Sequence, residues 1–177
     1  MKTFTSRLAA AAAICPLLVG GGLVASGAQA QGQGSDHTRV VLKPSVTETL
    51  EDAGVEATAI NGAYAYLFKG TIAIHFNETS QRNGVLKHNG GVVLKSDSGR
   101  VSLRRLVVNL NKDRVTALVN GDQRARVLTV STPSRRPQLG RLRLKLTGVA
   151  AGVLNDAFGT RFERKDTLAY ATAFGRD

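Results

Sequence analysis

A strict alternation of apolar and charged residues near the C-terminus constrains this fold more than any other feature of the sequence. From Arg141 to Leu146, three leucines alternate with three cations. Successive side chains of a β-strand point to opposite faces of the sheet, so Leu142, Leu144 and Leu146 are predicted to face inward. The segment is therefore expected to be a strand with one buried and one solvated face.

The same period of two recurs along most of the chain. Strands are predicted around residues 71–76, 101–110, 115–119, 124–130, 141–146 and 167–174. Within 101–110 the apolar parity changes at Arg104-Arg105, which a β-bulge would reconcile. Asn120-Gly121 lies between two strand-like runs and predicts a hairpin turn.

Two short helices are expected to interrupt the strands. Ser45 and Glu48 have the spacing of a capping box at the start of the first helix, which Gly54 would end. The second is expected from Gly148 to Gly159, with its apolar residues on one stripe. Both are too short to be stable alone and must pack on the sheet. The predicted class is all-β, an antiparallel sandwich or half-open barrel with two short helices.

The N-terminus has the pattern of a cleaved export signal. Lys2 and Arg7 precede an uncharged run rich in alanine, leucine, valine and glycine, and Ala28-Gln29-Ala30 supplies the small residues that signal peptidase requires. This pattern divides the chain into a predicted signal peptide at 1–30, a flexible tether at 31–37 and a single β domain at 38–174. The mature chain would be secreted, with cell-wall association as one option, and would not be an integral membrane protein.

Composition narrows the chemistry of the mature domain. Cys15 lies in the predicted signal, so cleavage would leave 147 residues without cysteine, which excludes thiol catalysis, iron–sulfur ligation and a cysteine-based zinc site. The whole chain carries a formal net charge of +11, and loss of Lys2 and Arg7 would leave +9. Such an excess favours an anionic partner, such as a cell-wall polymer or an anionic small ligand. Nucleic acid is not expected, because exposed aromatic residues do not interleave with the cations.

No arrangement of residues predicts catalysis. The sequence has no Gly-x-Ser-x-Gly elbow, no phosphate-binding loop and no pair of acids placed to separate their pKa values. His37, His75 and His88 lack the spacing of a metal site. We therefore predict that the protein is not an enzyme and has neither catalytic nor metal-binding residues.

Some of the cations follow the strand period. Arg141, Arg143 and Lys145 would lie along one sheet face at intervals of about 6.5–7 Å, and Arg104-Arg105 adds two more. This spacing suits a phosphate or another polyanion, so the five residues are predicted to form an anion-binding surface. The alternative is that a half-solvated sheet needs a polar outer face, which arginine and lysine supply.

Two tyrosines and two histidines form a second candidate site. Tyr64 and Tyr66 share a parity on a predicted strand, His75 follows soon after, and His88 lies in a Lys-His-Asn-Gly-Gly turn. A phenolate with a partnered histidine is one way to hold ferric haem, and arginine or lysine can receive the propionates. Haem is thus the candidate cofactor for these four residues. Each tyrosine could instead be a packing residue of the sheet.

Four stretches of the sequence resemble the HtaA-type domain, found in exported haem-uptake proteins of actinobacteria and in uncharacterised relatives. They are residues 45–55, 84–94, 107–121 and 154–158, which span most of the predicted domain. Gly90-Gly91 after His88 is the most specific piece, because family members have a Gly-His-x-Gly turn that opens a strand.

The resemblance implies a secreted or cell-surface binding module. Haem-binding members use an axial tyrosine near the N-terminal helix, supported by a histidine in that turn, and His88 matches the supporting position. Residues 39–53 contain no tyrosine or tryptophan. Either Tyr64 or Tyr66 provides the ligand from another strand, or the chain keeps the fold without haem. The alternative function is a structural or adhesive surface protein whose basic face contacts an anionic cell-wall polymer or lipid.

Overall fold

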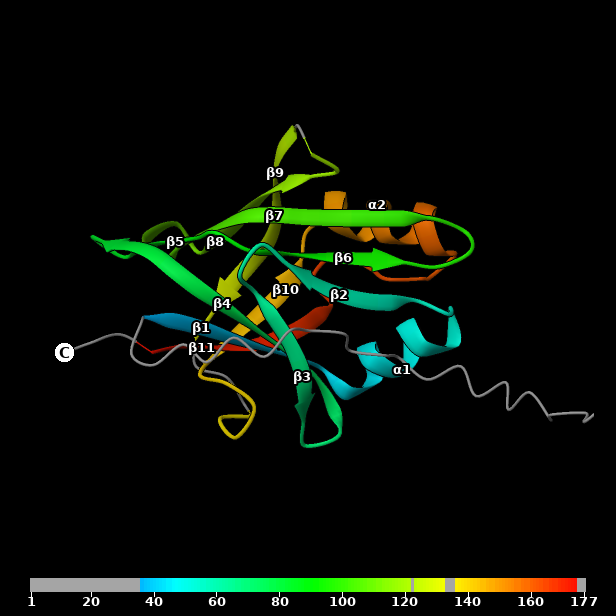
Figure 1. Cartoon of the computed structure of the whole chain (residues 1–177), viewed down its shortest axis with the longest axis horizontal. Helices are drawn as coiled ribbons and strands as arrows, with labels where there is room; N and C mark the ends of the chain where they lie inside the picture. Colours follow the sequence, from blue (N-terminus) through cyan, green and yellow to red (C-terminus); the bar gives the residue numbers. More distant parts are fainter. Residues whose placement is uncertain (1–35, 122, 133–135, 175–177) are drawn as a thin grey trace, which may run out of the picture.

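The computed structural model describes residues 36–121, 123–132 and 136–174. Within these ranges the chain forms eleven strands, two α-helices and one short 3-10 helix (Figure 1). The elements are β1 (His37–Leu42), α1 (Pro44–Asp52), β2 (Glu56–Ile60), β3 (Tyr64–Phe68), β4 (Thr71–Arg82), β5 (Val85–His88), β6 (Gly91–Lys95), β7 (Arg100–Asn109), η1 (Leu110–Lys112), β8 (Arg114–Val119), β9 (Gln123–Ser131), β10 (Leu142–Leu146), α2 (Gly148–Phe158) and β11 (Thr167–Phe174).

Eight of the strands close into an antiparallel barrel. Their order round the barrel is β7–β5–β4–β1–β11–β10–β9–β8, and the pairing of β8 with β7 closes the ring. The predicted class, antiparallel all-β with two short helices, is confirmed. The predicted sandwich or half-open barrel is corrected to a closed barrel, because alternation shows which face of a strand is buried but not which strands pair.

The three strands outside the ring, β2, β3 and β6, extend the sheet from β4 and β7. β5 joins these two strands at one end of the barrel, whereas at the other end β3 pairs with β4, and β2 and β6 extend from β7. The turn between β5 and β6 fits into this corner, where Gly90 N–H donates to the Asn61 carbonyl at 3.2 Å. A Cβ on Gly91 would clash with the Leu103 carbonyl oxygen, so the close approach of the two backbones requires glycine there.

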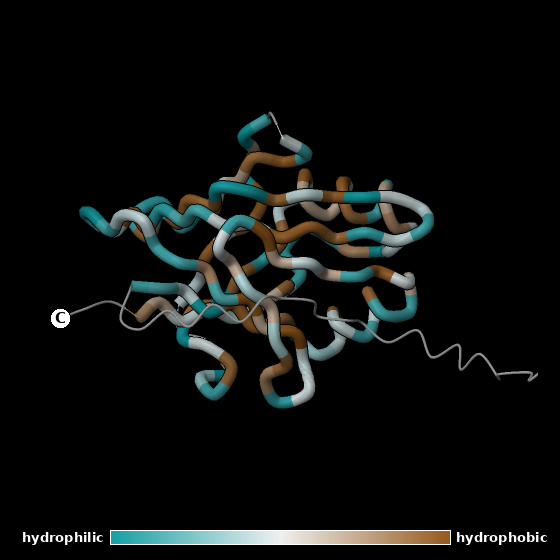
Figure 2. The backbone as a smooth tube through the Cα atoms, in the orientation of Figure 1, coloured by the Kyte–Doolittle hydropathy of each residue, from teal (hydrophilic) through white to brown (hydrophobic). Residues whose placement is uncertain are grey.

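The core lies inside the barrel, and both helices cover the same end of it. In Figure 1 this end is on the right, opposite the β4–β5 hairpin, and Figure 2 shows the hairpin tip as hydrophilic. Leu50 of α1 and Leu154 of α2 belong to the same core cluster as the inward side chains of the strands. Helices this short are stabilised by such packing rather than by their own propensity.

Several local expectations are confirmed. The register of β7 against β8 shifts after Arg104, and Arg105 has φ 49°, which is the predicted bulge. Asn120 and Gly121 form the turn between β8 and β9, and Leu144 and Leu146 are buried.

Both predicted helices occur, but only α2 has a side-chain N-cap and a glycine C-cap. α2 begins after Thr147, whose hydroxyl accepts from Ala150 N–H, and ends at Gly159 with φ 67°. The predicted capping box of α1 is wrong: Lys43 is the N-cap and makes no side-chain cap hydrogen bond. Pro44 stands at the first helical position, where its fixed φ and missing N–H suit a helix start.

The predicted boundaries are only partly within the described residues. The signal peptide and most of the tether lie outside them. β1 begins at His37, one residue before the predicted start of the domain, and β11 ends at Phe174, where the domain was predicted to end. In the described ranges no helix has the length and apolar character needed to cross a membrane.

Candidate functional site

A row of aromatic rings covers the outer surface of β3, β4, β1 and β11. We call it the aromatic face, and its residues are His37, Arg39, Tyr64, Tyr66, Phe68, His75 and Phe174. The rings of His37 and His75 stack with centroids 4.1 Å apart, and His37 stacks on Phe174 at 4.7 Å. Ile74 and Phe76, which flank His75 on β4, line the barrel interior. Because side chains alternate along a strand, His75 and the rings stacked on it point outward.

Tyr64 and His75 form the polar centre of this face. They are directly opposite each other in the β3–β4 pair. The Tyr64 hydroxyl lies 2.9 Å from His75 Nδ1, and the two rings stack at 4.4 Å. Tyr66 lies beside Tyr64, with its ring centroid 5.8 Å away. The structure thus brings together three of the four predicted haem residues.

The electrostatics favour a neutral imidazole beside a neutral phenol. Burial, then the nearby His37 and Arg39, lower the pKa of His75 to about 4. His75 is therefore uncharged at neutral pH, and its Nδ1 can accept a hydrogen bond from the Tyr64 hydroxyl. Burial, and to a lesser extent Tyr66, raise the pKa of Tyr64, so its phenolate needs an added cation to form.

Arg39 supplies a positive charge within the same face, since β1 places it directly opposite His75. Its guanidinium carbon lies 4.5 Å from the centre of the Phe68 ring and 5.3 Å from that of Phe174. Its Nε is buried and has no hydrogen-bond partner. A buried donor without a partner is costly for the folded protein.

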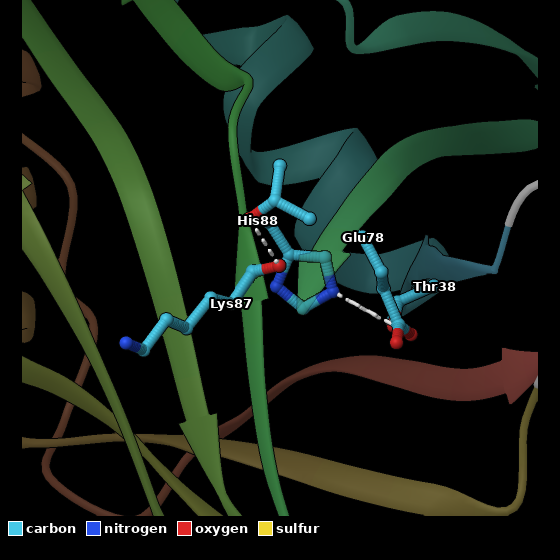
Figure 3. A network of polar contacts seen from close by, with 5 residues as sticks. Thr38, Glu78, Lys87 and His88 are labelled. Carbon is cyan, nitrogen blue, oxygen red and sulfur yellow. Dashed lines mark hydrogen bonds and ion pairs between the residues drawn. The ribbon is translucent and has the colours of Figure 1, made fainter. Parts of the chain in front are cut away.

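The fourth predicted haem residue, His88, lies apart from the other three, inside the barrel (Figure 3). It is 4% exposed, and its Nε2 lies 3.0 Å from Thr38 Oγ1. Thr38 donates to Glu78 Oε1 at 2.8 Å, and Nε2 lies 3.8 Å from the same carboxylate oxygen. His88, Thr38 and Glu78 therefore form a buried polar network within an otherwise apolar wall.

Burial dominates the titration of this network. It lowers the pKa of His88 to about 4, and the Leu106 carbonyl, which lies outside hydrogen-bond geometry, only partly opposes this. Burial also raises the pKa of Glu78, against the effect of its hydrogen bond from Thr38. His88 is thus a neutral core residue at neutral pH.

The barrel interior is too small for a haem-sized ligand. It holds a cavity of about 120 Å³, whose lining is apolar except for Thr38 and His88. Small-molecule sites usually occupy about 300–1,000 Å³. A porphyrin would therefore need the outer surface of this fold rather than its interior.

The five predicted anion-binding residues do not share one patch. Arg141, Arg143 and Lys145 lie on or next to β10, whereas Arg104 and Arg105 lie on β7, with β8 and β9 between. Arg143 Nε donates to Ser131 at 3.1 Å. Arg104 Nε is buried without a partner, while Arg105 is exposed in the bulge.

Sequence reasoning missed His37, Arg39, Phe68 and Phe174 of the aromatic face. His37 and Arg39 have the same parity on β1, which is the signal that could have found them. The predicted tether included His37, however, and nothing in the sequence shows that β1 lies between β4 and β11. In the described ranges no cluster of three or more metal-ligating side chains occurs.

Two solved structures are similar to this chain. Heme binding protein HtaB from Corynebacterium glutamicum superposes with a TM-score of 0.52 over 80% of this chain and 96% of HtaB, at 16% sequence identity. The fold is that of an HtaA-type domain. The C-terminal domain of HtaA from the same organism superposes with a TM-score of 0.49, at 12% identity, over 78% of this chain and 94% of that domain. No protein-family model and no curated protein matches the sequence.

In this HtaA-type fold His88 lies in the interior polar network with Thr38 and Glu78. At 16% identity the likeness establishes the architecture only. The residues near α1 include no tyrosine, and the hydroxyl that His88 contacts is that of Thr38. A tyrosine–histidine pair does occur, but on β3 and β4.

Proposed function

We propose that this chain is an exported module that binds haem on the aromatic face, with Tyr64 as the iron ligand. The observation that carries the proposal is the 2.9 Å contact between the Tyr64 hydroxyl and His75 Nδ1. A phenolate is a known ligand of ferric haem iron, and a neutral imidazole at this distance can accept a hydrogen bond from the phenol and hold its oxygen in place. HtaB, which has the same fold, is a haem-binding protein.

The surroundings of the pair fit a flat, anionic ligand. The rings of His37, His75 and Phe174 stack on one another beside Tyr64, and Phe174 is 38% exposed at the end of the stack. The Arg39 guanidinium, which lies between the Phe68 and Phe174 rings, supplies the positive charge for a propionate. Lys69, whose Nζ lies 5.7 Å from the Phe68 ring, is a second cation there.

The proposal is tested by titrating the purified apo-protein with hemin and recording the Soret region. We expect saturable binding with a spectrum of tyrosine-ligated ferric haem. Tyr64→Phe keeps the stacked ring but removes the ligand oxygen, so it should weaken binding about tenfold or more. Tyr170→Phe is the matched control, because it removes the same hydroxyl group from the tyrosine that lies outside the aromatic face. Its affinity should stay within about threefold of the parent.

Two results would overturn the proposal. One is a wild-type spectrum no different from that of free hemin. The other is equal affinity of Tyr64→Phe and the parent protein. The competing prediction, a surface protein whose basic face contacts an anionic wall polymer, is left with a weaker basis, because its five cations lie in two separate parts of the barrel.

A further inference from the structure

A second concave site lies on a different part of the surface, between the outer side of β9 and β10 and the start of α2. It is a groove of about 520 Å³. We call it the basic groove, and it is lined by Arg126, Thr129, Ser131, Lys145, Leu146, Thr147, Gly148, Val149, Arg164 and Lys165. Nothing in the aromatic face contributes to it.

Four cations from three separate segments meet in the basic groove. Arg126 comes from β9, Lys145 from β10, and Arg164 and Lys165 from the segment before β11. No carboxylate is among the lining residues. Within the described ranges none of the four forms an ion pair. Their mutual repulsion would be relieved by an anion bound between them.

The polar groups around the cations are held in place by their own bonds. Thr147 Oγ1 donates to the Arg126 carbonyl at 2.8 Å and thereby ties the start of α2 to β9. Ser131 Oγ accepts from Arg143, which leaves its own hydrogen free to be donated. The acid next to Lys165 is engaged elsewhere, since Asp166 accepts from the Glu163 N–H at 2.8 Å.

We propose that the basic groove binds the phosphate group of a larger ligand, independently of haem binding. Phosphate matches several convergent cations and the uncommitted hydroxyl hydrogen of Ser131. The groove is also much larger than a small oxyanion requires, since one water occupies about 30 Å³ of liquid. The group attached to the phosphate would occupy the rest. The phosphate can belong to a soluble compound or to a lipid headgroup.

The test measures two probes at a constant ionic strength of about 0.15 M, so that general screening does not change. Pyrophosphate binding is measured by titration calorimetry, and vesicles of phosphatidylglycerol in phosphatidylcholine are used in co-sedimentation. We expect saturable binding of at least one probe. Binding of pyrophosphate identifies a soluble source, and binding of vesicles alone identifies a lipid headgroup.

Two variants and a control locate the binding. Lys145→Gln with Arg164→Gln should weaken it about tenfold or more, because each charged contact is strong. Arg82→Gln with Arg100→Gln removes the same charge from exposed sites outside the groove and should leave affinity within about twofold.

Gly148→Leu obstructs the groove without any change of charge. The nearest atom to a Cβ at Gly148 is Arg164 Cδ, at 4.0 Å, so the backbone has room for the new side chain. Binding should weaken. The proposal is overturned if neither probe binds, if the control variant loses as much affinity as the groove variant, or if Gly148→Leu binds as the parent does.

Discussion

Replacing His88 with glutamine should remove a large pH-dependent part of the stability of this domain. His88 is 4% exposed, and its Nε2 contacts Thr38 Oγ1 at 3.0 Å. A glutamine can keep an amide N–H toward Thr38 but does not titrate. Any pH dependence that the variant lacks is therefore due to the imidazole.

The direction and size of this change in unfolding free energy with pH follow from the pKa of His88. Burial lowers this pKa to about 4 in the folded state, whereas an unfolded chain has about 6.5. The unfolded state therefore binds more protons between these values, so stability is full above pH 6.5 and is lost as the pH falls toward 4. Between pH 7 and pH 5 the loss due to His88 is about 2 kcal/mol.

The measurement is urea unfolding followed by far-ultraviolet circular dichroism at pH 7 and pH 5, for the parent and His88→Gln. Other groups also titrate. The lowered pKa of His75 makes the protein less stable as the pH falls through the same window, whereas the raised pKa of Glu78 makes it more stable. His75 lies outside the His88 network and cancels in the comparison. Glu78 shares that network, so the same pair of proteins is also compared with Glu78→Gln in both, which removes its titration. The parent should lose about 2 kcal/mol more than the variant. Equal losses in the two proteins would refute this account of His88.

Two further predictions concern stability. Gly91→Ala should destabilise the fold by about 2 kcal/mol or more, because its Cβ meets the Leu103 backbone. Gly152→Ala in α2, with no atom near the new Cβ, should instead stabilise the fold by about 0.5–1 kcal/mol. The urea midpoints of both variants at pH 7 check this, and a midpoint of Gly91→Ala equal to that of the parent would contradict it. Asn155→Ala should cost about 1–3 kcal/mol, since the Asn155 amide bonds both the N–H and the carbonyl of Phe162, at 2.8 and 2.9 Å; an unchanged thermal midpoint would show that these bonds do not anchor the loop.

Local rules applied to the sequence predicted most of the elements. Alternation identified strands such as 141–146, the parity change located the bulge at Arg104-Arg105, and the apolar stripe with Gly159 placed α2. These features depend on neighbours in the sequence, where the period of two or 3.6 is fixed by backbone geometry. The first helix was found, but its cap was wrong, since Pro44 and not Ser45 sets its start.

Pairing between distant strands decided the candidate sites. The sequence showed that Tyr64 and Tyr66 share a face, but only the β3–β4 register places Tyr64 opposite His75. Likewise, only the position of β1 between β4 and β11 stacks His37 on His75 and Phe174.

By itself, then, the sequence determined that this chain is a small basic antiparallel β domain with two short helices and aromatic residues on a shared strand face. The tertiary structure decided that the sheet closes, that His88 is inside while Tyr64 and His75 are outside, and that Arg126, Lys145 and Arg164 meet in one groove. The physical reason is that a period of two assigns each side chain to a face, whereas barrel closure fixes which faces and strand ends become neighbours.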